Sequence, residues 1–146
     1  MIPPSIKNNK MEKIVVEVHW AEKNFNCGWA MPGIGTVIVA EKSLDKAKQA
    51  FKEALDFHIE GMLEDGDTVP GWLANGDYEI TFKPDISAIL REAEQYTTMT
   101  ALSKASGINL KQLSHYANSI KTPREPQRAK IISGIHKIGQ ELMAIH

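Results

Sequence analysis

Side chains that could read DNA bases recur at helical spacing between Leu110 and Thr122. We take Leu113 as the residue of this segment that faces the core. At about 100° per residue, Tyr116, Ala117 and Ile120 turn inward with it. The opposite side has no carboxylate and consists of Lys111, Ser114, His115, Asn118 and Thr122. A helix that lies in the major groove needs such hydrogen-bonding side chains, so we expect this helix to contact base edges.

Basic side chains follow the same segment directly, at positions 121, 124, 128 and 130. They are placed to meet phosphates once the helix is docked, which provides affinity rather than sequence choice. The alternative is a helical hairpin that packs on the first domain and leaves a polar face to solvent. The predicted DNA-binding residues are Lys111, Gln112, Ser114, His115, Asn118, Lys121, Arg124 and Arg128.

Two helices over residues 98–106 and 110–121 must position these side chains, and a tight turn joins them. Gly107 suits the positive φ that ends the first helix. Ile108 fills the angle between the two helices, and Asn109 caps the second one. The spacing therefore predicts a helix-turn-helix.

This segment resembles the Cro/C1-type (XRE-like) helix-turn-helix across residues 98–142. The residues that carry the resemblance are Leu102, Gly107-Ile108, Leu113-Ser114 and Pro123. The sequence departs from the family pattern at Ser103, where a small alanine is usual, at Leu110, where a polar residue is usual, and at Ser119, where glycine is common. Helices over 86–96 and 125–145 complete an all-α domain.

Apolar side chains form a stripe along the last predicted helix, at spacings of three and four residues: Ile131, Ile135, Ile138, Leu142 and Ile145. The stripe either completes the helical core or reaches another subunit at its outer end. One helix-turn-helix buries little DNA surface, so such modules usually bind two half-sites as dimers. We therefore expect a homodimer or a higher homo-oligomer on double-stranded DNA.

A different periodicity governs the first part of the chain. Alternating apolar and polar residues predict a strand over 12–20, and β-branched residues predict one over 36–40. Shorter strands are expected over 27–31 and 77–83. Ser43 caps a helix whose apolar positions recur through Leu63, and residues 64–76 form a loop. We expect residues 1–11 to form a frayed leader. The order βββαβ predicts an α+β fold, with one domain at 12–84 and the all-α domain at 85–146.

Three segments of this first domain carry a second resemblance: Met31-Pro32-Gly33, the helix from Ser43-Leu44-Asp45 to Glu64-Asp65-Gly66, and Val69-Pro70. Across residues 12–85 the chain is similar to the HicB antitoxin domain. The resemblance implies a partial RNase H-like fold that binds and blocks a small basic HicA-type mRNA-cleaving toxin. It also implies that the complex represses its own operon by binding its own operator.

Charge is unevenly distributed behind the overall net charge of −1. Residues 1–85 hold nine Lys/Arg and fourteen Asp/Glu, a net charge of −5. Residues 86–146 hold eight and four, a net charge of +4. The acidic part suits a basic partner and the basic part suits a polyanion.

Catalytic chemistry finds little support in the first domain. A metal-dependent nuclease needs several carboxylates around Mg²⁺, but only Glu17, Asp56 and Glu60 are candidates. We interpret them as solvated charges. His58 lies beside the apolar stripe and is interpreted as a structural histidine, and Cys27 as a structural thiol. We expect no enzyme activity, no cofactor and no metal.

The apolar runs are short, the start of the chain lacks signal-peptide character, and there is one cysteine. These features predict a cytoplasmic protein that does not cross a membrane. Trp72, in the predicted loop, is the tryptophan expected to be exposed to a partner. Two alternatives stay open: a stand-alone transcriptional regulator whose first domain senses a ligand or protein, and an interaction module that binds protein through both halves.

Overall fold

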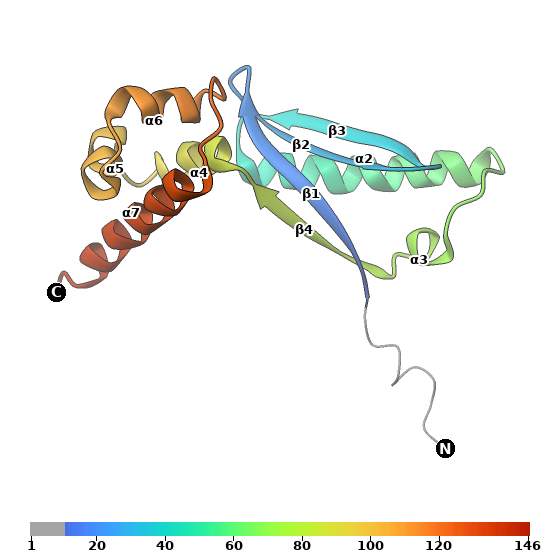
Figure 1. Ribbon diagram of the computed structural model, residues 1–146. Helices are drawn as coiled ribbons and strands as arrows, with labels where there is room; N and C mark the ends of the chain where they lie inside the picture. Colours follow the sequence, from blue (N-terminus) through green and yellow to red (C-terminus); the bar gives the residue numbers. More distant parts are fainter. Residues whose placement is uncertain (1–10) are drawn as a thin grey trace. The chain divides into compact units, whose positions relative to one another are not determined.

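The computed structural model describes residues 11–146 as a four-stranded mixed sheet with six helices (Figure 1). The predicted α+β class is confirmed. The leader expected at residues 1–11 lies outside the described residues except for Met11. The chain divides into two compact units. Residues 11–18 and 26–83 form the sheet unit, and residues 19–25 and 84–146 form the helical unit.

The sheet contains β1 (Glu12–Ala21), β2 (Asn24–Met31), β3 (Gly35–Glu41) and β4 (Tyr78–Pro84), in the order β3-β2-β1-β4. The first three strands form a meander, and β4 runs in the same direction as β1 (Figure 1). All four predicted strands are confirmed. The second strand begins three residues earlier than its apolar pattern suggested, at Asn24 rather than Cys27.

One face of the sheet is covered by α2 (Leu44–Glu64). The Ser43 side chain caps this helix by accepting a hydrogen bond from the Lys46 backbone N–H at 3.2 Å. Phe51 and Leu55 are fully buried, and the Phe51 ring meets the Phe82 ring of β4 edge to face at 6.0 Å between centroids. Burial of each such side chain contributes about 2 kcal/mol. The core of the sheet unit consists of Ile14, Val16, Val18, Cys27, Ile34, Val37, Ala47, Phe51, Leu55, Ile59 and Leu73.

A short helix, α3 (Gly71–Ala74), lies in the segment predicted to be a loop, so that prediction is wrong for these four residues. Pro70 precedes the first turn, and the Leu73 side chain is buried, which anchors the turn. Trp72 is half-buried and meets the Tyr78 ring edge to face at 6.3 Å between centroids. Trp20 and Trp29 are half-buried as well.

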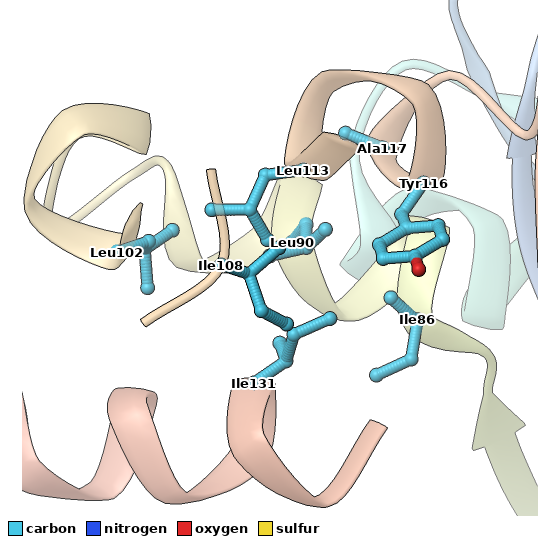
Figure 2. Close-up of a cluster of buried hydrophobic side chains, with 8 residues drawn as sticks. All are labelled: Ile86, Leu90, Leu102, Ile108, Leu113, Tyr116, Ala117 and Ile131. Carbon is cyan, nitrogen blue, oxygen red and sulfur yellow. The ribbon is translucent and has the colours of Figure 1, made fainter. Parts of the chain in front are cut away.

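The helical unit contains α4 (Ile86–Ala93), α5 (Met99–Ser106), α6 (Leu110–Ala117) and α7 (Glu125–Met143), which confirms the four predicted helices. Both α4 and α6 end earlier than predicted, at Ala93 and Ala117. Figure 2 shows Leu90, Ile108 and Leu113 packed together at the centre of this unit. Its core consists of Ile86, Leu90, Leu102, Ile108, Leu113, Tyr116, Ala117 and Ile131.

The tip of the β1–β2 hairpin, residues 19–25, belongs to the helical unit, so a single cut near Pro84 does not describe the division. The Trp20 backbone N–H donates to the Ser87 hydroxyl at 2.8 Å. The Trp20 ring lies 5.2 Å from the Arg91 guanidinium and meets the Phe25 ring edge to face at 5.0 Å. These contacts hold the tip within the helical unit.

Helix α7 approaches α5 at Gly134, where a Cβ would lie 2.8 Å from the backbone nitrogen of Ser106. Ile131 is buried, and Ile135 and Ile138 pack partly against the core. The first part of the predicted stripe therefore completes the helical core. Leu142 and Ile145 remain 56% and 72% exposed. None of the helices formed by residues 11–146 has the length and apolar composition of a membrane span.

Candidate nucleic-acid interface

The first helix of the predicted DNA-reading pair, α5, has defined ends. The Thr98 hydroxyl accepts a hydrogen bond from the Ala101 N–H at 3.0 Å and caps the start. Gly107, with φ of 78°, donates its N–H to the Ser103 carbonyl at 2.9 Å and closes the end. A side chain is strained at this positive φ, which explains a glycine at this position.

Two serine hydroxyls close the turn between α5 and α6. The Ser103 Oγ donates to the Ile108 carbonyl at 2.6 Å. The Ser106 Oγ accepts from the Ile108 N–H at 3.2 Å. Ile108 is thus held at both backbone groups, and its side chain is buried in the core. The departure from alanine at Ser103 therefore supplies a hydrogen bond that fixes the turn.

Helix α6 starts at the predicted cap, where the Asn109 side chain accepts from the Gln112 N–H at 2.8 Å. The predicted inward orientation of Leu113, Tyr116 and Ala117 is confirmed, because all three side chains are buried. The prediction is wrong for Ile120, which is 65% exposed.

Ile120 is exposed because the chain leaves the helix at the end of α6. Ser119 has a φ of 60°, in the left-handed region. The Ile120 N–H bonds to the His115 carbonyl at 2.9 Å, and the Ser119 N–H bonds to the Tyr116 carbonyl at 3.2 Å. These bonds form a Schellman motif, which turns the chain out of the helix. Thr122 consequently lies beyond α6 and not on its outer face.

The Asn118 side chain forms hydrogen bonds at the C-terminal end of α6. Its Nδ2 donates to the Ser114 carbonyl at 2.9 Å, and its Oδ1 accepts from a guanidinium N–H of Arg91. The Arg91 Nε also donates to the Ala117 carbonyl at 3.3 Å. Gln112 is held similarly, because its Nε2 donates to the Tyr116 hydroxyl at 2.8 Å. Gln112 and Asn118 are therefore already partnered within the helical unit, and the Ser114 hydroxyl accepts a longer hydrogen bond from the Asn118 Nδ2 at 3.4 Å.

The other predicted side chains differ in exposure. Lys111 is exposed, whereas Ser114 and His115 are half-buried. Lys121 and Arg124 are exposed in the segment between α6 and α7, and Arg128 is half-buried in the first turns of α7. Residues 95–124 contain four basic side chains and no Asp or Glu. This carboxylate-free stretch has the charge that phosphates require.

The structure separates the carboxylates considered for a nuclease site. Alternation along β1 places Glu17 on the face opposite the buried Val16 and Val18, which face α2. Asp56 and Glu60 are exposed on α2 itself, on the other side of the sheet. Among residues 11–146 no group of three or more His, Cys, Asp or Glu side chains could hold a metal ion.

His58 and Cys27 are two side chains of the sheet unit considered for reactivity, and each is at least half-buried in the fold. The His58 Nε2 donates to the Ile34 carbonyl at 2.6 Å, which confirms the interpretation of His58 as a hydrogen-bonded structural residue. Cys27 is fully buried. Burial raises the pKa of its thiol, and the nearby Lys48 ammonium opposes this shift. A buried thiol of this kind is poorly reactive.

An open groove lies at the β2–β3 turn of the sheet unit, lined by Pro32, Gly33, Ile34, Met62, Asp67, Thr68 and Pro70. Pro32, Gly33 and Pro70 belong to the segments that carry the antitoxin resemblance. Comparison of this chain with protein-family models, with curated proteins and with solved structures gives no match.

Proposed function

We propose that this chain is an antitoxin and transcriptional regulator. Its helical unit binds operator DNA through a helix-turn-helix formed by α5 and α6. Its sheet unit, with a partial RNase H-like arrangement, binds and neutralises a small basic HicA-type mRNA-cleaving toxin. The complex represses its own operon.

One observation carries the DNA-binding proposal: α6 presents Lys111, Ser114 and His115 on a side without carboxylates, while a tightly bonded turn holds its start. Neutral and cationic donors on a rigid helix suit base edges in the major groove. Three side-chain hydrogen bonds fix the turn and the start of α6, so the helix is held rigidly.

Phosphate contacts are assigned to Lys121, Arg124 and Arg128, which follow α6 directly. We assign Gln112 and Asn118 a supporting role in base reading, because each is bonded within the unit and needs rearrangement to contact a base. Leu142 in the last turn of α7 and Ile145, just beyond the helix, are exposed, which supports a homodimer that places two α6 helices on two half-sites.

The antitoxin proposal rests on the element order of the sheet unit and on its charge. A βββαβ order with β4 parallel to β1 agrees with the fold that the resemblance implies. Between Lys52 and Lys83 the chain carries eight Asp/Glu and no Lys/Arg. Such a surface favours a basic partner and disfavours nucleic acid.

DNA binding is tested by fluorescence anisotropy with the DNA upstream of the chain's own gene. The Lys111→Ala/His115→Ala double variant is expected to weaken specific binding at least about tenfold without lowering the melting temperature. Lys137→Ala, which removes an exposed charge from α7 in the same unit, is the matched control and should stay within about twofold. Unchanged affinity of the double variant would exclude α6 from base reading.

The toxin is tested by co-expression with the small open reading frame next to this gene. A neighbour that stops growth alone, co-purifies with this chain and is neutralised by it supports the antitoxin. A harmless or non-binding neighbour contradicts it and leaves a stand-alone regulator.

A further inference from the structure

The solvent side of α2 carries an exposed aromatic ring among carboxylates. Phe57 is 78% exposed, although most large apolar side chains of this helix are buried or half-buried. Glu53, Phe57, Glu60 and Glu64 follow one another at spacings of four, three and four, so they share one stripe. With Asp56 beside it, this stripe is called the acidic Phe57 face: Glu53, Asp56, Phe57, Glu60 and Glu64.

Basic and acidic side chains are segregated along α2. Lys46, Lys48 and Lys52 all lie in its first half. The Lys48 Nζ lies 5.6 Å from the centroid of the Phe82 ring. Of the carboxylates on the acidic Phe57 face, Glu53 accepts a hydrogen bond from Gln49 at 3.1 Å. Within residues 11–146 none of these five residues takes part in a salt bridge.

This arrangement weakens the isolated helix. Asp56 and Glu60, and then Glu60 and Glu64, are like-charged pairs at four-residue spacing, which disfavour helix formation. The last turn has no basic residue, so its carboxylates meet the negative end of the helix dipole. These carboxylates therefore do not stabilise the helix, and a positively charged partner would neutralise them.

Phe57 is also unshielded by its neighbours on the helix. Ala50, Ala54 and Gly61 lie beside it at spacings of seven, three and four residues. A Cβ added at Gly61 would meet no atom within 4 Å. One side of the ring is thus bordered by small residues and the other by carboxylates. Protein-binding sites commonly have an aromatic side chain near the centre and a polar rim.

We infer that the acidic Phe57 face is the docking surface for a basic protein, with Phe57 inserted between apolar side chains and the carboxylates paired with Lys or Arg. This inference rests on the proposed function, for which it names the toxin-binding surface. The negative charge disfavours nucleic acid as the occupant. It also disfavours a second copy of the same face, because like charges would meet.

The test measures binding of the full chain to the purified product of the neighbouring open reading frame by isothermal titration calorimetry, at two salt concentrations. Phe57→Ala is expected to weaken binding at least about tenfold. Ile38→Ala is its control, since Ile38 is 67% exposed on the sheet face opposite α2. It should change the affinity by less than about twofold.

Charge reversal separates binding from folding. Glu60→Lys removes two like-charged pairs and places a cation near the end of α2, so the variant should be at least as stable as the original chain. Its affinity is nevertheless expected to fall about tenfold, with a weaker dependence on salt. Glu17→Lys makes the same charge change on the opposite sheet face and should leave the affinity nearly unchanged.

Each outcome has a distinct meaning. Binding by the original chain that persists in Phe57→Ala and Glu60→Lys overturns this inference and leaves the antitoxin proposal standing. Absence of binding by the original chain overturns both. A shift of the free chain from oligomer to monomer on Phe57→Ala, in sedimentation, assigns the face to a second copy and also overturns the inference.

Discussion

Ser119 holds a left-handed backbone conformation that most L-residues avoid, at the point where α6 ends. Its hydroxyl donates to the Trp20 carbonyl, so the side chain offsets part of the conformational cost. This explains how a serine occupies a position where the resembling helix-turn-helix domains commonly have glycine. The neighbouring exposure of Ile120 follows from the same backbone turn.

Two variants at this residue separate strain from hydrogen bonding. Ser119→Ala keeps the strained φ and loses the bond to Trp20, so we expect it to lower the free energy of unfolding by about 1 kcal/mol. Ser119→Gly loses the same bond but removes the strain. It should be more stable than Ser119→Ala by about 1 kcal/mol in urea unfolding. Equal stabilities would contradict a strained conformation at this position.

At the scale of elements, the packing of α7 on α5 depends on the absence of a side chain at Gly134. An added Cβ would lie 2.8 Å from the Ser106 nitrogen and 2.9 Å from its Cα, and both belong to backbone that cannot rotate away. Ser106 also ends α5 and bonds the Ile108 N–H. Because Ser106 takes part in both contacts, a shift of α7 away from α5 would also disturb the turn before α6.

Gly134→Ala is accordingly expected to destabilise the protein by about 2 kcal/mol, because the helices must separate. Gly139→Ala is the matched control in the same helix, since its Cβ would meet no atom within 4 Å. That variant should gain up to about 1 kcal/mol from helix propensity alone. Thermal unfolding measured by circular dichroism compares the two. Stabilisation by both substitutions would show that α7 does not need the glycine.

At the scale of the whole molecule, the tip of the β1–β2 hairpin, residues 19–25, belongs to the helical unit, although the rest of β1 and β2 belongs to the sheet unit. Trp20 joins Ser87 and Arg91 of α4, and Arg91 in turn bonds the end of α6. One arginine thus connects the hairpin tip with the helix proposed to read DNA.

Trp20→Ala is therefore expected to increase hydrogen exchange in α4 and α6, by removing ring contacts worth about 2 kcal/mol. Trp29→Ala is the comparison, since Trp29 is half-buried within the sheet unit and its loss should affect the sheet amides instead. Hydrogen exchange read by mass spectrometry resolves both regions. Faster exchange confined to the sheet in Trp20→Ala would contradict the assignment of the tip to the helical unit.

Much of this architecture follows from local sequence patterns. Alternation in β1, helical periodicity in α2, and the caps Ser43, Asp85, Thr98 and Asn109 act over a few residues. The buried positions Leu113, Tyr116 and Ala117 and the glycine of the turn were predictable for the same reason. So were the exposed Lys111 and the basic residues after α6.

Tertiary structure alone decided the rest. The end of α6 at Ala117 depends on Arg91, which is 26 residues away, and on the left-handed Ser119. The position of Trp20 depends on Ser87, 67 residues along the chain, and the glycine requirement at 134 depends on Ser106 in another helix. Periodicity records only which face of an element is apolar. Single long-range hydrogen bonds and close backbone approaches leave no repeating pattern, so they emerge only when the elements are packed.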